Sequence, residues 1–171
     1  KTVIAIGAGA FSNLYGITEI VIPATVKTID VSAFENCFDL QKITYEGSPT
    51  YFGSIDGVLY SDNNKLLLKY PEGKTDESFT VPTRVDIIKS SAFKNNQFIK
   101  HITLPDNVGG DNYVGKIEAY AFYGCTSLES INLGHVNYFE RECFKNCQSL
   151  KAVTFEAENV WGIGNDAFLG C

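Results

Sequence analysis

One short motif recurs along the chain and restricts the folds that the chain can adopt. The motif reads I-x-x-x-A-F-x-x-C-x-x-L-x-x-I-x-L-P-x-x-V-x-x-I, and its copies start at Ile6, Ile29, Ile88, Ile117, Phe139 and Ile163. Its period of about 23 residues is typical of solenoid repeats. A unit this short cannot bury its own apolar side, so the copies must stack on one another.

The repeat predicts where strands and turns lie. Its I-x-L alternation is typical of a strand with one buried face. The expected strands are 20–22, 43–45, 79–81, 102–104, 131–133 and 153–155, which should pair in parallel, in that order, as one sheet. The Ala-Phe segments are too short for independent helices and predict single helical or 3₁₀ turns. Equivalent residues of successive coils should then lie about 4.8 Å apart in ladders.

Two insertions interrupt the repeat. The first, at about 107–115, contains the turn-rich run Gly109-Gly110-Asp111-Asn112 and predicts a loop. The second, at about 46–78, holds two apolar runs on either side of Ser61-Asp62-Asn63-Asn64. This arrangement predicts a β-hairpin at 57–71 that replaces the Ala-Phe half of one repeat.

From about Val3 to Cys171 the pattern resembles the BspA-like leucine-rich repeats of surface proteins from bacteria and some protists. The hairpin sequence D-G-V-L-Y followed by L-L-x-Y-P also resembles a variation within that family. The chain departs from the pattern at Leu14 and Asn96, where Cys is expected, and at Cys143, where Ala is expected. The resemblance implies a single domain over 1–171 of about 6–7 coils, a right-handed solenoid with a parallel β-sheet on one face.

Composition narrows the range of partners. The formal net charge is -6 and the pI is about 4.9, without a cluster of Lys and Arg, so binding to nucleic acid or anionic lipid is not expected. No apolar run approaches the length of a membrane span, about 18 residues. The chain starts at Lys1 and contains no Met, which favours a processed or excised piece of a longer product.

The five Cys follow the repeat. Cys37, Cys125, Cys147 and Cys171 share one position of the motif, so we expect buried thiols that act as small apolar groups with a weak donor. A disulfide between neighbouring coils and a metal site remain alternatives. The spacing argues against zinc, because it is the repeat period rather than C-x-x-C.

Other possible sites have a simpler explanation in the repeat. Gly7-x-Gly9 follows an apolar run as a dinucleotide-binding turn would, but Pro23 arrives before a long helix could form. His101 and His135 are expected at the surface, and Asp62-x-Asn64 lacks the Gly and the Glu of a calcium loop. We therefore expect no enzyme activity, no catalytic residue, no cofactor and no metal.

The function that the resemblance implies is a non-enzymatic binding or adhesion module, on the cell surface or secreted. Its ligands would be proteins or polysaccharides of host or neighbouring cells. The alternative is a structural spacer that carries another functional domain. Neither end of the chain looks like a cap, so we expect that it continues in the natural protein or that an end packs against another copy.

Two groups of residues are candidates for partner binding. The outward strand positions offer Glu19, Lys42, His101 and Asn132. The hairpin region offers Tyr51, Phe52, Tyr60 and Tyr70, because aromatic side chains are enriched at binding hot spots. These four rings could instead seal the hairpin against the solenoid. Exposure separates the two possibilities, since a contact site needs at least two of the rings in solvent.

Overall fold

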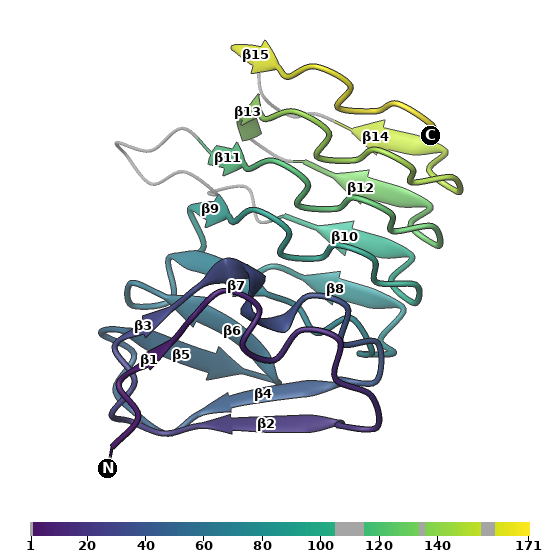
Figure 1. Ribbon diagram of the computed structural model, residues 1–171. Coiled ribbons are helices and arrows are strands. Elements are labelled where there is room, and N and C mark those ends of the chain that lie inside the picture. The colour runs from purple at the N-terminus through teal and green to yellow at the C-terminus, as the bar shows by residue number, and fades with distance from the viewer. Residues whose placement is uncertain (1, 105–114, 134–135, 155–159) are drawn as a thin grey trace.

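The computed structural model describes residues 2–104, 115–133, 136–154 and 160–171 (Figure 1). The chain winds as a solenoid from the N-terminus at one end to the C-terminus at the other, and each coil adds a strand to one or both of two sheet faces. The parallel solenoid predicted from the repeat is thereby confirmed. The insertion predicted at 107–115 lies, apart from Gly115, outside the described residues.

The predicted strands form the first face, which we call the strand face. They are β2 (Glu19–Ile22), β4 (Lys42–Tyr45), β8 (Ser78–Thr80), β10 (His101–Thr103), β12 (Ser130–Asn132) and β14 (Ala152–Thr154). Their pairing is parallel, and the motif's inward residue sets the register: Ile20 lies opposite Ile43, and Ile102 opposite Ile131. The predicted parallel register is confirmed within each sheet.

The single continuous sheet that we predicted is wrong. The strand face consists of a two-stranded sheet, β2-β4, and a four-stranded sheet in the order β14-β12-β10-β8. The hairpin insertion causes the gap, because it occupies the edge of β4. The Ile43 N–H donates to Gly57 O at 2.9 Å, and the Tyr45 N–H donates to Ser54 Oγ at 3.0 Å.

A second set of short strands was not predicted. These are β1 (Ala5–Ile6), β3 (Thr28–Ile29), β9 (Ile87–Ile88), β11 (Gly115–Ile117), β13 (Val136–Phe139) and β15 (Gly162–Ile163). They contain the aliphatic or aromatic residue that starts each repeat, and they pair in parallel within their sheets. Strands of two to four residues carry too little alternation to be recognised as strands in a sequence.

The predicted hairpin consists of β6 (Val58–Ser61) and β7 (Leu66–Lys69), which pair antiparallel. A third strand that we did not predict, β5 (Phe52–Ile55), pairs antiparallel with β6. β7 also pairs in parallel with β9, so the second face holds a seven-stranded sheet, β15-β13-β11-β9-β7-β6-β5.

The hairpin separates two hydrophobic cores. Leu59 and Leu68 point into the core of the N-terminal coils, whereas Tyr60 and Leu67 point into the core of the C-terminal coils. Successive side chains of a strand point to opposite faces, so a strand between two cores must be apolar on both. This explains the nearly continuous apolar runs of the insertion.

The Ala-Phe segments form tight turns that stack their rings. Only Val31–Phe34 among the described turns is a 3₁₀ helix, η1, and the Asp30 carboxylate accepts from its Ser32 N–H at 2.9 Å. The centroids of stacked rings lie 4.8 Å apart for Phe93 and Phe122, and 4.9 Å apart for Phe122 and Phe144. The residue two places after the stacked Phe, which we call the ladder ring, has positive φ in each described turn of this kind. These residues are Asn13, Asn36, Asn95, Gly124, Asn146 and Gly170. Asn and Gly tolerate this conformation best.

Candidate functional site

The candidate site is the outward side of the strand face. The four residues predicted at outward strand positions lie on two separate parts of it. Glu19 on β2 and Lys42 on β4 are register partners, and their charged groups lie 2.8 Å apart. Thr44 Oγ1 donates to the same carboxylate at 3.2 Å. The hydrogen bond from Lys42 is the largest effect that lowers the pKa of Glu19 below its ordinary value.

The other predicted pair lies on the four-stranded sheet. His101 on β10 is exposed, and its Nδ1 lies 2.8 Å from Ser130 Oγ on β12. Asn132 is half-buried on β12, between Thr103 of β10 and Thr154 of β14 in register. The gap between β4 and β8 therefore divides Glu19 and Lys42 from His101 and Asn132. Sequence reasoning placed all four on one sheet.

A row of alternating charges on the four-stranded sheet was missed. It lies just before the strands and consists of Glu77, Lys100, Glu129 and Lys151. Lys100 Nζ lies 2.7 Å from Glu77, and Lys151 Nζ lies 3.2 Å from Glu129. The hydrogen bond with Glu77 raises the pKa of Lys100, and the hydrogen bond with Lys151 lowers the pKa of Glu129. The signal was available, because these residues share one position of the motif.

A cleft opens at the gap in the strand face. Its volume is about 240 Å³, and it is lined by Gln41, Lys42, Asp56, Lys74, Thr75 and Asp76. Lys74 Nζ pairs with Asp76 at 2.8 Å. Asp56 reaches this position because it forms the tight β5–β6 turn, with φ of 49°. Lys42 is thus the predicted candidate that lines the cleft.

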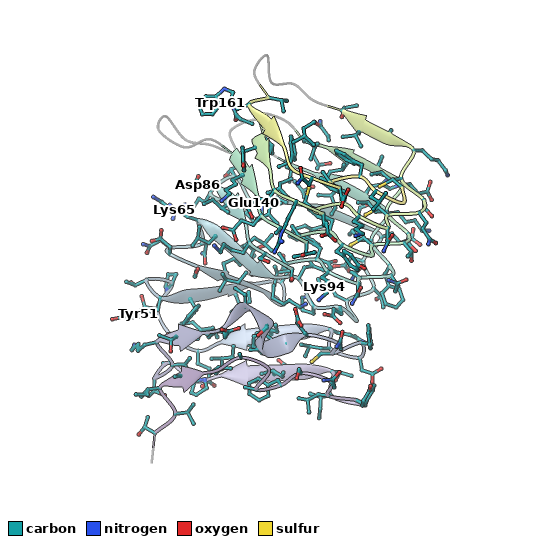
Figure 2. The ribbon with its side chains drawn as sticks, turned by 45° about the horizontal axis from the view of Figure 1, so that its top comes forward. Tyr51, Lys65, Asp86, Lys94, Glu140 and Trp161 are labelled. Atoms are coloured by element: carbon teal, nitrogen blue, oxygen red, sulfur yellow. The ribbon has the colours of Figure 1, made fainter. Side chains whose placement is uncertain are left out.

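Three of the four hairpin rings are buried, as expected if they seal the hairpin against the solenoid, so the two exposed rings that a contact site needs are not present. Phe52 is 6% exposed, and both Tyr60 and Tyr70 are 0% exposed, because the hairpin lies between the two cores. Burial raises the pKa of both buried tyrosines well above the ordinary value. Tyr51, which is labelled in Figure 2, is 48% exposed. Lys27 Nζ lies 4.1 Å from the centre of the Tyr51 ring.

The motif's cysteines form a ladder of thiols. Within the described residues all five Cys are free, and Cys37, Cys125, Cys143 and Cys147 are buried. The thiol at the motif position donates to the carbonyl of the ladder Phe one coil earlier; for Cys125 and Cys147 this distance is 3.1 Å. Burial raises the pKa of Cys143 and of Cys147 to about 12. Such thiols remain protonated and unreactive near neutral pH.

The described part of the chain lacks two further features. It contains no cluster of three or more His, Cys, Asp or Glu side chains arranged to hold a metal ion. None of its helices has the length and apolar character needed to cross a membrane.

Comparisons with known proteins agree with the repeat and the fold. Residues 1–66 and 72–171 match the BspA type leucine rich repeat region, in 6 copies. Among curated proteins, none matches the chain. A leucine-rich repeat protein from Eubacterium ventriosum is 28% identical, with a TM-score of 0.72 over 82% of this chain and 37% of that protein.

Two other solved structures share the fold at lower identity. The pneumococcal vaccine antigen PcpA is 24% identical, with a TM-score of 0.73 over 98% of this chain and 46% of that protein. A leucine rich cell surface protein from Faecalibacterium prausnitzii is 24% identical, with a TM-score of 0.55 over 91% of this chain and 58% of that protein. The chain thus spans less than two thirds of these proteins. Because the repeat model matches nearly the whole length, the chain belongs to the BspA-type leucine-rich repeat family.

Proposed function

We propose that the chain is a non-enzymatic binding and adhesion module, on the cell surface or secreted, and that its strand face contacts the partner. The single observation that carries the proposal is the fixed row of exposed, charged side chains on that face, Glu77, Lys100, Glu129 and Lys151. The sheet sets the spacing between them, so the row needs little ordering when a partner binds.

The charges of this face suit recognition more than stability. Exposed ion pairs contribute at most about 1 kcal/mol to folding, so the pairs Lys42–Glu19 and Lys151–Glu129 stabilise the coils only weakly. Charges at an interface chiefly select the partner and accelerate association. A protein or polysaccharide with complementary polar groups could approach along the row without displacing the backbone.

Two relatives support a location outside the cell. One is described as a leucine rich cell surface protein and another as a vaccine antigen. The role of a structural spacer is the second candidate. It is favoured by the small outward residues Ser78, Thr80 and Ala152, which offer a partner little contact area.

The test is adhesion of beads coated with the chain to cultured epithelial cells and to bacterial cells. Reversal of two strand-face charges, Lys42→Glu with Lys100→Glu, should reduce the number of bound beads about tenfold at low salt. The matched control is Lys65→Glu, which changes the charge in the exposed β6–β7 turn outside the strand face. Equal adhesion of all three proteins, with unchanged circular dichroism, would favour the spacer.

A further inference from the structure

The hairpin leaves one coil incomplete on the side of the solenoid that the Ala-Phe turns form, which we call the turn side. Leu67 pairs with Ile88 in register, but Tyr70 follows Leu67 sooner than Phe93 follows Ile88. Tyr70 nevertheless fills the ladder position, because its ring stacks on that of Phe93 at 4.8 Å and its N–H donates to Ala92 O at 2.8 Å. The residues that precede the ladder ring in other coils are therefore missing from this one.

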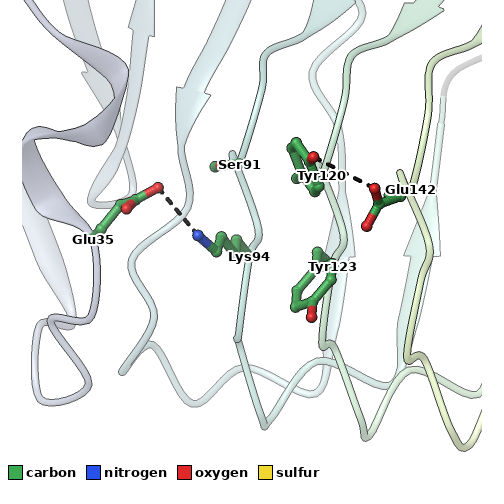
Figure 3. Close-up of a pocket in the computed structure, with 6 residues that line it drawn as sticks. All are labelled: Glu35, Ser91, Lys94, Tyr120, Tyr123 and Glu142. Atoms are coloured by element: carbon green, nitrogen blue, oxygen red, sulfur yellow. Dashed lines mark hydrogen bonds and ion pairs between the residues drawn. The ribbon is translucent and has the colours of Figure 1, made fainter.

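A cavity of about 380 Å³ lies on the turn side of this coil. It is lined by Glu35, Ser91, Lys94, Tyr120, Tyr123 and Glu142 (Figure 3). Glu35 stands on one side of the missing turn, and the two tyrosines and Glu142 stand on the other. Lys94 extends between them, and its Nζ lies 3.2 Å from Glu35 Oε1. The volume lies within the range of small-molecule sites, about 300–1,000 Å³.

The two tyrosines are held in place by neighbouring coils. Their ring centroids lie 6.0 Å apart, with the planes inclined by 65°. Asn146 Nδ2 donates to the Tyr123 hydroxyl at 3.2 Å, and the guanidinium of Arg141 lies 5.4 Å from the centre of the Tyr120 ring. Side chains fixed in this way lose little freedom when a ligand binds.

The charges of the cavity are paired. Lys94 pairs with Glu35, and Lys145, which is not a lining residue, pairs with Glu142 at 2.8 Å, so both carboxylates of the lining have a counterion. The ammonium groups donate hydrogen bonds, and the carboxylates accept them. A neutral ligand with many groups that both donate and accept fits this lining. An ion would be attracted by one member of each pair and repelled by the other.

We propose that this cavity binds a sugar unit of a neutral polysaccharide. A sugar ring carries an apolar C–H face, which would lie against the ring of Tyr123, and hydroxyl groups, which would bond to the ion pair Lys94–Glu35 and to the carboxylate of Glu142. The cavity opens on the turn side, so a long chain could pass through it without threading. The inference rests on the proposed function, because it names one ligand class for an adhesion module and adds a site separate from the strand face.

The test is electrophoresis of the chain through native gels that contain dextran, mannan or galactan, with polygalacturonate as the charged comparison. At least one neutral polysaccharide should retard the chain. Tyr123→Ala should weaken this binding about tenfold, which corresponds to the loss of one aromatic contact. Tyr123→Phe retains the ring and should bind nearly as well as the original chain.

Two controls keep the result interpretable. Tyr51→Ala removes an exposed tyrosine outside the cavity and should leave the retardation unchanged. If Tyr123→Ala unfolds, Lys94→Met removes the hydrogen-bond donor instead and should weaken binding. The proposal is overturned if no neutral polysaccharide retards the chain, if only polygalacturonate does, or if folded Tyr123→Ala and Lys94→Met bind as the original does. Lost adhesion of the strand-face variants together with any of these results would leave the proposed function standing.

Discussion

The ring of Tyr70 lies 4.8 Å from that of Phe93, and the planes are inclined by 21°, so the last aromatic residue of the hairpin continues the phenylalanine ladder. The ladder then runs on to Phe122, Phe144 and Phe168. Tyr70 also lies edge-on to Phe79, at 5.0 Å. The hairpin insertion thus preserves the central stacking of the solenoid while it shortens one coil.

Removal of the Tyr70 ring should strongly destabilise the C-terminal coils. Tyr70→Ala should lower the free energy of unfolding by about 3–5 kcal/mol, because the ring is fully buried in the ladder. Tyr70→Phe should cost only about 1 kcal/mol, since it loses a single hydrogen bond to Asp76. Urea denaturation followed by circular dichroism measures both. Equal effects of the two substitutions would mean that the hydroxyl, not the ring, matters at this position.

The role of Tyr70 marks the limit of what the sequence could predict. Ile, Phe and Cys recur in the motif because stacked coils place like residues above one another, and this was enough to predict the solenoid and the register. Lys69 and Tyr70 stand where Ala and Phe would be expected, so the incomplete coil looked like an interruption. The buried rings of the hairpin and the gap in the strand face both arise because the hairpin lies between the two cores.

The candidate site was predictable only in part for a related reason. Side chains at outward positions do not pack in the core, so their residue types need not repeat from coil to coil. The charged row could therefore be found only by alignment of every position of the motif, not just the inward ones. The cavity on the turn side is harder to predict still, because Glu35 and Lys94 meet across a turn that is missing from the coil between them.

A buried ion pair joins the incomplete coil to the N-terminal coils. The side chains of Lys69 and Glu72 are 2% and 0% exposed, and their charged groups lie 2.8 Å apart. Glu72 Oε1 also accepts from the Asn36 N–H at 3.2 Å. In other coils a backbone carbonyl of the next turn accepts from the equivalent N–H, as Tyr123 O does from Asn95. The carboxylate therefore replaces a carbonyl that the shortened coil does not supply.

Neutralising one partner of this pair should be costly. Glu72→Gln should lower the free energy of unfolding by about 3 kcal/mol, because it leaves the charge of Lys69 buried without a counterion. The double variant Lys69→Met with Glu72→Gln should be more stable than Glu72→Gln alone. Thermal unfolding compares them, with the exposed Glu129→Gln as a control that should cost less than about 1 kcal/mol. A double variant less stable than the single one would contradict this account.

Asn96 shows why one coil departs from the cysteine ladder. Its Nδ2 lies 3.2 Å from Pro71 O, 3.1 Å from Glu72 O and 3.1 Å from Lys74 O, and its Oδ1 accepts from the N–H groups of Phe98 and Ile99. Asn96→Cys would restore the motif yet should destabilise the chain by about 1–3 kcal/mol, because a thiol cannot satisfy this many buried polar groups. Chemical denaturation measures the difference. A gain in stability would show that the motif outweighs the local hydrogen bonds.

The thiols should differ in reactivity according to their burial. Cys171 is exposed, although partial burial raises the pKa of its thiol too, whereas burial raises the pKa of Cys143 and of Cys147 to about 12 and that of Cys125 well above its ordinary value. A thiol reagent at pH 8 should therefore modify Cys171 quickly in the folded chain and reach the buried thiols only after unfolding, because the thiolate is the reactive form. Under denaturing, non-reducing conditions all five thiols should react. Recovery of three or fewer would indicate disulfides between coils.

The same thiols should make the chain less stable in alkali. A thiol whose pKa is raised by folding holds its proton in the folded chain at a pH where the unfolded chain has lost it. Its contribution to stability is therefore complete below the ordinary thiol pKa and falls as the pH rises toward about 12, the pKa of Cys143 and Cys147 in the folded chain. Urea midpoints measured between pH 8 and pH 10.5 should decrease for the original chain. Cys143→Ala with Cys147→Ala should start from a lower midpoint and decrease less steeply, and an equal slope would show that other groups cause the loss.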